Sequence, residues 1–389
     1  MANYEKRGNN WRYRISLGKN PSTGKYEYIS KSGFARKSDA KNHAEMVERQ
    51  IRNGEYIAPS THTFNYVADE WIKHYSRDAK ISSVRARNKA IYHAKQQFGN
   101  RNIQAITKRD YQSFVDDMSA QFSKNYVDSI VSSTNLIFKY ALDMKLISKL
   151  PTEGIKRTKY KPTVEDLEEN TIHQKFLEKD ELFEFLSVAK DHHAPLNSFE
   201  VFTTLAYTGM RAGELLALKW SDIDLEECTV SITKTYYNPN NNKKNYQILT
   251  PKTESSIGKI SIDPNVIKLL QDYKVNVQDK WKNELYVDNN FIFTDNNGYP
   301  LVIKKLSQWI QAIMTKTNID KNITTHSFRH THCALLIEAG VHIKEIQERL
   351  RHKDINTTMN IYAKITESYK KDASQKFSKL MENVSSNLF

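Results

Sequence analysis

The periodic patterns of this sequence stop between Pro151 and Thr171, and this break excludes a single hydrophobic core. The stretch contains proline and glycine, then a basic run over 156–161 and an acidic run over 165–169. Such a composition is typical of a linker between domains. A chain of 389 residues is also longer than one compact core usually supports. We therefore expect a linker over 151–173, with domains over 1–58 and 62–150 before it and one domain over 174–389 after it.

The first 58 residues predict a small β-sheet followed by one helix. Apolar side chains alternate with Arg12 and Arg14, which gives a strand with one apolar and one basic face. Turn residues at 21–24 separate this strand from a second one over 26–29. Because the segment is strongly basic, we expect it to lay strands into a DNA groove as an accessory reader. The alternative is a minor structural appendage.

Residues 62–150 predict four short amphipathic helices that pack as a bundle. We expect Thr63 and Ser123 to cap the first and the last of them, and Thr107 with Asp110 has the spacing of a capping box. The charged faces of such helices are usually only solvated, but in a basic protein they can also follow a phosphate backbone. The DNA-binding candidates here and in the linker are Arg85, Arg87, Lys156 and Arg157.

The segment 174–389 predicts a mostly α domain with one small antiparallel sheet. We expect a strand over 229–235, a hairpin around 248–262, a helix that begins at Asp263-Pro264, and a further strand over 291–293. Helices fill the rest of the segment. The fold class that follows is a multidomain, mainly α protein, with a small N-terminal sheet and helix, a helical bundle, and a mixed α/β domain.

The net charge of +13 indicates a polyanionic partner, most commonly nucleic acid. The plain alternative is that the charge only keeps the protein soluble. Cys228 and Cys333 lie in apolar surroundings, so they predict buried free thiols in a reducing compartment rather than a disulfide. No apolar run approaches the about 18 residues that a membrane span needs, and the N-terminus lacks an apolar signal segment. We therefore expect a soluble, cytoplasmic protein without a membrane partner.

Two arginines and a histidine in the last segment predict a site for an anion. Arg211 lies near the expected start of a helix that also carries Glu214. His326 and Arg329 are three residues apart and share one face of a helix. Two guanidinium groups neutralise the non-bridging oxygens of a phosphate well, and a helix N-terminus adds amide groups and a favourable dipole.

A metal site is the competing interpretation of the same segment. His326 and His330 are spaced four residues apart, which suits zinc. The histidine and cysteine that follow face other directions, and Arg329 would repel a cation. If Thr324 or Thr325 caps the helix, as we expect, His326 and Arg329 lie in its first turns, where an anion is favoured. We therefore expect no metal.

Three further residues complete a set able to cleave a phosphodiester without a metal. Tyr362 offers a phenol as nucleophile, His352 precedes it by ten residues, and Lys252 stands beside the tip of the expected hairpin. A phenol, with a pKa near about 10, needs a proton acceptor and a positively charged pocket to attack. Taken alone, a hairpin lysine is usually solvent-facing, and a tyrosine on a helix is usually a core or surface aromatic.

Together these motifs resemble the tyrosine recombinases, and among them the integrases of phages and transposons. The matching stretches are TGMRAGE at 208–214, TPKT at 250–253, HSFRHT at 326–331, and LRH at 350–352 followed by Tyr362, in the order that this family has. The catalytic resemblance covers about 175–380. Residues 62–150 resemble the helical core-binding domain of the family, and residues 1–58 its arm-binding domain.

The resemblance implies a role for each residue. Tyr362 forms a 3′-phosphotyrosyl link and frees a 5′-hydroxyl, Arg211, Arg329 and His352 hold the scissile phosphate, Lys252 protonates the leaving oxygen, His326 assists proton transfer, and Glu214 supports the pocket. The resemblance implies no cofactor, because the phosphotyrosine keeps the energy of the broken bond. The partners that it implies are double-stranded DNA at core and arm sites, further copies of the chain in a tetramer, and a directionality factor.

One position departs from the family. Arg351 stands where the family usually has glycine, just before the second histidine. An arginine in the left-handed conformation that suits glycine would cost about 1–2 kcal/mol, and the alternative is that Arg351 contacts DNA. Two other functions also stay open. One is a type IB-like topoisomerase, which the basic N-terminal domain disfavours, and the other is a non-catalytic DNA-binding protein on a recombinase scaffold.

Overall fold

The computed structural model describes residues 2–21, 23–157, 176–191, 195–251, 254–351, 354–355 and 359. The chain forms two compact units, Met1–Lys161 and Pro162–Phe389. The finer division that the sequence suggests, with domains over 1–58, 62–150 and 174–389, stays a prediction. Among the described residues, no helix is both long and apolar enough to cross a membrane.

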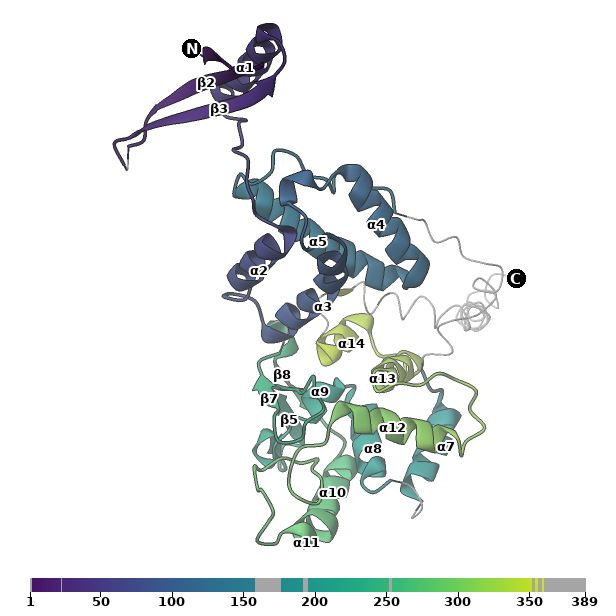
Figure 1. Ribbon diagram of the computed structural model, residues 1–389. Helices are drawn as coiled ribbons and strands as arrows, with labels where there is room; N and C mark the ends of the chain where they lie inside the picture. The colour runs from purple at the N-terminus through teal and green to yellow at the C-terminus, as the bar shows by residue number, and fades with distance from the viewer. Residues whose placement is uncertain are drawn as a thin grey trace, which may run out of the picture. The chain divides into compact units, whose positions relative to one another are not determined.

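The N-terminal unit begins with an antiparallel three-stranded sheet in the order β1-β2-β3 (Figure 1). Its strands are β1 (Ala2–Arg7), β2 (Asn10–Lys19) and β3 (Tyr26–Phe34). The expected alternation in β2 is confirmed, because Tyr13 and Ile15 are buried while Arg14 between them is exposed. Helix α1 (Lys37–Arg52) packs Ala44 and Val47 against these two side chains. A period-2 strand and a period-3.6 helix thus share one small core.

Four helices then form the predicted bundle. They are α2 (Phe64–Tyr75), α3 (Ile81–Phe98), α4 (Lys108–Gln121) and α5 (Lys124–Asp143). Aromatic rings fill its core, with the ring centroid of Phe98 5.8 Å from that of Phe64 and 5.2 Å from that of Phe114. The capping box of Thr107 and Asp110 is confirmed, since each side chain accepts a hydrogen bond from the other residue's N–H.

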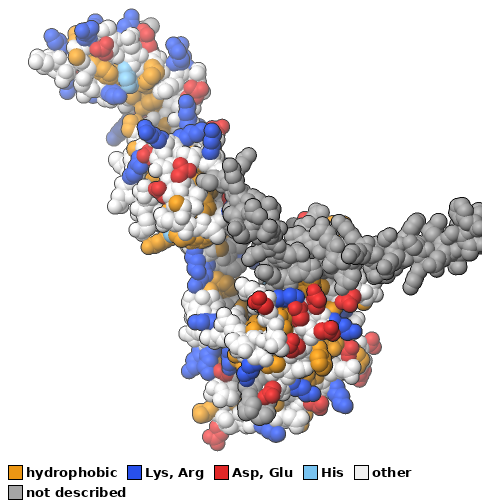
Figure 2. Space-filling model, turned by 90° about the vertical axis from the view of Figure 1, so that its right-hand side faces the viewer, with side chains coloured by type: hydrophobic (Ala, Val, Ile, Leu, Met, Phe, Trp, Pro, Cys, Tyr) orange, Lys and Arg blue, Asp and Glu red, His pale blue; other side chains and the backbone are white. Residues whose placement is uncertain are grey.

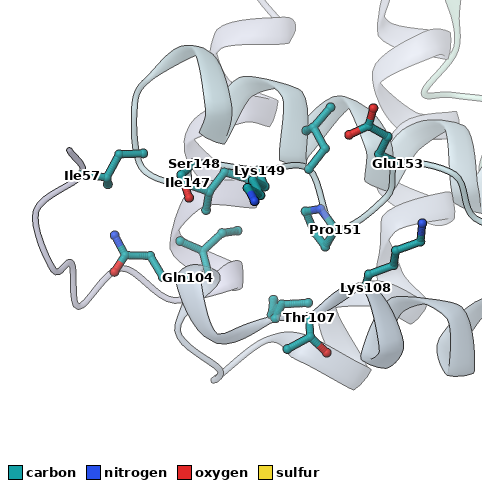
Figure 3. Close-up of a pocket in the computed structure, with 12 residues that line it drawn as sticks. Ile57, Gln104, Thr107, Lys108, Ile147, Ser148, Lys149, Pro151 and Glu153 are labelled. Atoms are coloured by element: carbon teal, nitrogen blue, oxygen red, sulfur yellow. The ribbon is translucent and has the colours of Figure 1, made fainter. Parts of the chain in front are cut away.

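A cavity of about 580 Å³ opens in the bundle beside Gln104. Its lining combines apolar residues such as Ile147 and Pro151 with the charged Lys108 and Glu153 (Figure 3). The Gln104 amide donates to the carbonyl oxygens of Ala58 at 3.0 Å and Leu146 at 2.9 Å. This amide therefore ties the segment that enters the bundle to the segment that leaves it.

The C-terminal unit is mostly α, as predicted. In its described part, the helices of eight or more residues are α7 (Lys179–Lys190), α8 (Ser198–Thr208), α10 (Pro264–Tyr273), α12 (Ile303–Met314), α13 (Ser327–Glu338) and α14 (Ile343–Leu350), and the single turn α9 covers Ala212–Leu215. Two small antiparallel sheets accompany these described helices. One has the order β4-β5-β8, from Ile223–Asp224, Thr229–Ile232 and Gly258–Ser261, and the other pairs β6 (Thr235–Tyr237) with β7 (Gln247–Leu249).

Three expectations about the strands of this unit are wrong. Residues 248–262 do not form a hairpin, because β7 pairs with β6 whereas β8 pairs with β5. The predicted strand over 229–235 is divided between β5 and β6, which belong to different sheets. Residues 291–293 do not form the predicted strand, because Phe291 makes only an isolated bridge to Lys219. Alternation along a segment shows which face is buried, but it does not identify the partner strand.

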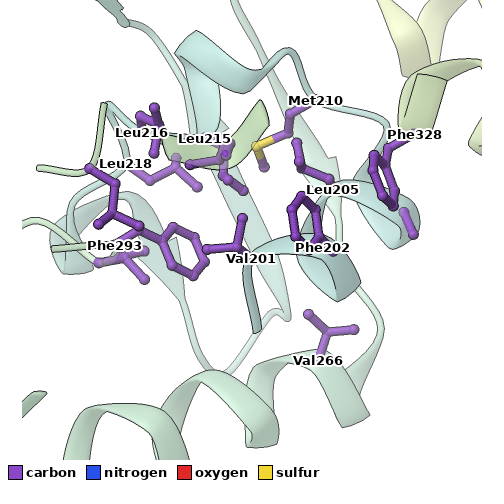
Figure 4. Close-up of a cluster of buried hydrophobic side chains, with 14 of the residues drawn as sticks. Val201, Phe202, Leu205, Met210, Leu215, Leu216, Leu218, Val266, Phe293 and Phe328 are labelled. Carbon is purple, nitrogen blue, oxygen red and sulfur yellow. The ribbon is translucent and has the colours of Figure 1, made fainter. Parts of the chain in front are cut away.

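The core of the C-terminal unit anchors the neighbours of Arg211 and Arg329. Met210 precedes the first arginine and is completely buried. Phe328 precedes the second, and its ring stacks on that of Phe202 with 5.0 Å between centroids. Figure 4 shows these three apolar side chains in one cluster. Their burial fixes the backbone from which both guanidinium groups project.

Candidate active site

Arg211 lies at the turn between α8 and α9 and is held by Glu214. The carboxylate of Glu214 accepts a hydrogen bond from Arg211 Nη1 at 2.7 Å and another from the Arg211 N–H at 3.1 Å. The Glu214 side chain is 2% exposed and that of Arg211 is 39% exposed. A buried carboxylate thus orients a guanidinium group that solvent can reach. The helix that we expected to begin here is the single turn α9.

Arg329 of α13 connects two distant parts of the unit from a buried position. Its Nη1 donates to the carbonyl oxygen of Gly209 at 2.7 Å, and its Nη2 donates to that of Leu350. Burial and, next, the charge of Arg211 lower the pKa of Arg329 to about 9. Arg329 therefore remains cationic at neutral pH, while it holds the ends of α8 and α14 at the same site.

His326 is the residue before α13 and lies close enough to both arginines for their charges to act on it. Burial lowers its pKa below the usual value, and the charges of Arg329 and Arg211 lower it further. His326 is therefore neutral at neutral pH and can accept a proton. The expected cap at Thr324 or Thr325 is wrong, because His326 itself takes the cap position while Thr324 donates its N–H to Ser327 Oγ at 3.0 Å.

Arg351 keeps the left-handed conformation that glycine would favour, with φ 56° and ψ 44°. Its side chain is 4% exposed, and its Nη2 donates to Glu214 at 2.6 Å. The guanidinium group points inward to Glu214, and the alternative that Arg351 contacts DNA stays a prediction. The local sequence contains no signal for this ion pair, which joins residues 137 positions apart.

Arg349 and His332 hold the C-terminal end of α8, next to Arg211, through hydrogen bonds. Arg349 Nε donates to His332 Nε2 at 2.9 Å, and its Nη2 donates to the carbonyl oxygens of Tyr207 and Ser261. The proton of the neutral ring is then on Nδ1, which donates to the Ala206 carbonyl oxygen at 2.8 Å. Burial, followed by the Arg349 charge, lowers the pKa of His332 to about 4. Sequence reasoning did not find Arg349, because its pattern is that of a surface arginine on a helix.

Gly209 packs so tightly against His332 and Leu350 that we expect Gly209→Ala to destabilise the unit by about 2–5 kcal/mol. Its φ is +62°, and a Cβ there would lie 2.7 Å from His332 Cδ2 and 2.8 Å from Leu350 Cδ2. Gly340→Ala is the matched control, because Gly340 has a φ of +76° and nothing within 4 Å of its Cβ position. In urea unfolding, the free energy of unfolding of the control should fall by about 1–2 kcal/mol, which is the cost of the left-handed conformation alone. Equal losses in the two variants would contradict the packing argument.

Three of the predicted site residues, Lys252, His352 and Tyr362, lie outside the described residues. The structure therefore brings together Arg211, Glu214, His326 and Arg329 from the predicted set, with Arg351 in addition. The residues that suggested zinc make other contacts, since the His326 and His330 rings pack edge to face with 4.7 Å between centroids. Among the described residues, no three His, Cys, Asp or Glu side chains are grouped so as to hold a metal.

The predicted DNA-binding residues all lie in the N-terminal unit, where basic side chains are widespread on the face drawn in Figure 2. Arg14 is exposed on the sheet, with its guanidinium carbon 3.5 Å from the centroid of the Tyr28 ring. Arg12 donates to Ser30, Arg87 to Ser133 and Arg157 to Asp128, whereas Lys156 is exposed and Arg85 half-buried. Their contact with DNA stays a prediction, and the bonds of Arg87 and Arg157 within the protein weaken it for those two.

Comparison with known proteins identifies the family. The Phage integrase family matches residues 175–368, an Arm DNA-binding domain matches 2–51, and the Phage integrase, N-terminal SAM-like domain matches 63–119. The Prophage ps2 probable integrase of Lactococcus lactis is 30% identical over 363 residues, which cover 90% of this chain and 93% of that protein. The chain belongs to the phage integrase family. The integrase of Staphylococcus phage L54a is 28% identical over 356 residues, which cover 87% of this integrase and 98% of that one.

The fold agrees with that assignment. The structure of the Tn1549 transposon integrase in complex with a circular intermediate DNA matches with a TM-score of 0.63 at 22% identity, over 77% of this chain and 94% of that one. The predicted fold class, mainly α with small antiparallel sheets, is confirmed. This integrase is a tyrosine recombinase, an enzyme that breaks and rejoins DNA strands at specific sites.

Proposed function

We propose that this integrase cuts DNA by attack of the Tyr362 phenol oxygen on the phosphorus of a scissile phosphodiester. The bond from phosphorus to Tyr362 forms while the bond to the 5′ oxygen of the next nucleotide breaks. His326 takes up the phenolic proton, and Lys252 supplies a proton to the leaving oxygen. Attack by a 5′-hydroxyl of another strand reverses these steps, so strands are exchanged without ATP, metal or cofactor.

The convergence of Arg211, Arg329 and His326 is the observation that supports this mechanism. The side chains come from two segments more than a hundred residues apart, and both guanidinium charges lower the pKa of the same imidazole. In our proposal the two arginines bind the non-bridging oxygens, His352 adds a hydrogen bond, and Glu214 orients Arg211. Charges that are already in place when negative charge develops on the phosphate stabilise the transition state strongly.

We further propose that the integrase integrates and excises a mobile element as a tetramer on two DNA duplexes. Each exchange breaks four strands, and one tyrosine forms one phosphotyrosyl bond, so four subunits are needed. The bundle over 62–150 would bind core sites, and the sheet over 1–58, with Arg14 stacked on Tyr28, would bind arm sites. A directionality factor would bias integration against excision, and the complex would act at the bacterial nucleoid.

The mechanism is tested by mapping the covalent bond. The integrase is incubated with a duplex from the end of its element, nicked just beyond the cleavage point so that the freed fragment diffuses away. Proteolysis and mass spectrometry should then find the nucleotide adduct on the peptide that contains Tyr362. Since the chain has 21 tyrosines, the position is informative. An adduct on any other residue would contradict the proposal.

A further inference from the structure

Arg351 combines a conformation that disfavours an arginine with an environment that disfavours a charge. Its φ of 56° is in the left-handed region, and burial lowers its pKa. A glycine at this position would have no conformational strain, and an arginine that pointed outward would keep its charge in solvent. The Arg351 side chain instead turns inward, and its stem packs beside Gly258 of β8.

The partner of Arg351 is a carboxylate that the active site already uses. One oxygen of Glu214, Oε1, accepts from Arg211 Nη1 at 2.7 Å. The other, Oε2, accepts from Arg351 Nη2 at 2.6 Å and from the Arg211 N–H at 3.1 Å. One buried carboxylate is thus shared between a half-exposed guanidinium group and a buried one.

The charges of this cluster do not balance. The positive charges of Arg211 and Arg351 lower the pKa of Arg329, and the negative charge of Glu214 raises it. Among the described residues, three arginines against one carboxylate leave two positive charges, because His326 is neutral. In addition, Nε and Nη1 of Arg351 are buried and have no hydrogen-bond partner in the described part of the chain. An excess of positive charge, together with buried donors that are not used, is stabilised when an anion binds.

We infer that Arg351 is a positioning residue of the phosphate site, which neutralises Glu214 so that the charge of Arg211 remains available to the scissile phosphate. The inference rests on the proposed function. Without Arg351, the Glu214 carboxylate would act on Arg211 alone, and the cluster would present one positive charge less. A phosphodiester carries one negative charge and gains a second as the tyrosine attacks, so the loss would be felt most in the transition state.

The test compares two substrates and four proteins in single-turnover cleavage. The substrates carry either the ordinary phosphate or an uncharged methylphosphonate at the cleaved position. The proteins are the wild type, Arg351→Met, Arg351→Gly and the double variant Glu214→Gln with Arg351→Met. Methionine keeps an unbranched stem against Gly258, while glycine accepts the left-handed conformation, so a folded variant without the charge is secured.

On the phosphate substrate we expect both single variants to be slower than the wild type by about 10-fold or more. On the methylphosphonate the difference should shrink to about 3-fold or less, because the transition state then carries one negative charge less. Glu214→Gln should partly restore the rate of Arg351→Met, since it removes the carboxylate charge that Arg351 otherwise neutralises.

Two results would overturn the inference. Wild-type rates in both single variants would show that Arg351 is not needed, and equal losses on the two substrates would show a role in folding alone. If the wild-type protein itself forms no adduct with the phosphate substrate, the proposed function fails, and this outcome is distinct from either of the others.

Discussion

Replacing Tyr362 with phenylalanine should abolish the covalent protein–DNA adduct and leave the affinity for DNA unchanged. The substitution removes one oxygen, which is the atom that bonds to phosphorus in the proposed mechanism, and keeps the aromatic ring. Loss of a nucleophile lowers cleavage by at least about 10³-fold. Denaturing gels with an end-labelled nicked duplex would measure the adduct, and a mobility shift would measure binding.

Tyr369→Phe is the matched control for this variant, because Tyr369 lies seven residues further along the same segment. It should form the adduct at the wild-type rate. A covalent adduct in Tyr362→Phe that disappears in Tyr369→Phe would move the nucleophile and refute the assignment. Loss of DNA binding in Tyr362→Phe would instead show that the tyrosine acts in recognition.

Local features of the fold were predictable from the sequence because their physics is local. A capping box involves residues three apart, so Thr107 and Asp110 could be recognised without knowing the tertiary structure. The same holds for the helix that begins at Asp263-Pro264, where the Asp263 side chain accepts from Asn265 N–H at 2.8 Å. In β2, the buried Tyr13 and Ile15 follow from alternation alone.

Contacts between distant segments were predictable only where the resemblance to a family supplied them. Periodicity could not have joined the Arg211 turn to Arg329, which donates a hydrogen bond to the carbonyl oxygen of Gly209, 120 residues earlier in the chain. The prediction of strand pairing was wrong for the same reason, since the patterns of β7 and β8 are compatible with a hairpin that does not form. The pairing depends on the packing of whole elements, which no short window contains.

The position where this chain departs from its family was the least predictable. A family comparison expects glycine at 351, and backbone physics explains why, because the φ there is positive. What neither source contains is the direction of the side chain that replaces it. The ion pair with Glu214 depends on α9 and α14 being brought together, and Arg329 contributes to this by binding the ends of α8 and α14.

Arg211→Ala should lower the rate of strand cleavage by at least about 100-fold, as does the loss of one preorganised charged donor in other active sites. The free energy of unfolding should change by no more than about 1 kcal/mol, because the side chain is 39% exposed and Glu214 keeps Arg351 as a partner.

Arg329→Ala should lower the stability of the unit more than Arg211→Ala does. It leaves the carbonyl oxygens of Gly209 and Leu350 without their buried donor, which costs about 1–3 kcal/mol for each group.

The pH dependence of the residual cleavage gives Arg211→Ala a second readout. The Arg211 charge lowers the pKa of His326, so its removal should raise that pKa toward the ordinary value. A proton acceptor works only when unprotonated, and the rise of the cleavage rate with pH should therefore shift to higher pH in the variant. Lys344→Ala, which breaks an exposed pair with Glu348, should leave the profile in place. An unshifted profile in Arg211→Ala would mean either that His326 is not the group that titrates or that the two side chains are not electrostatically coupled in the working complex.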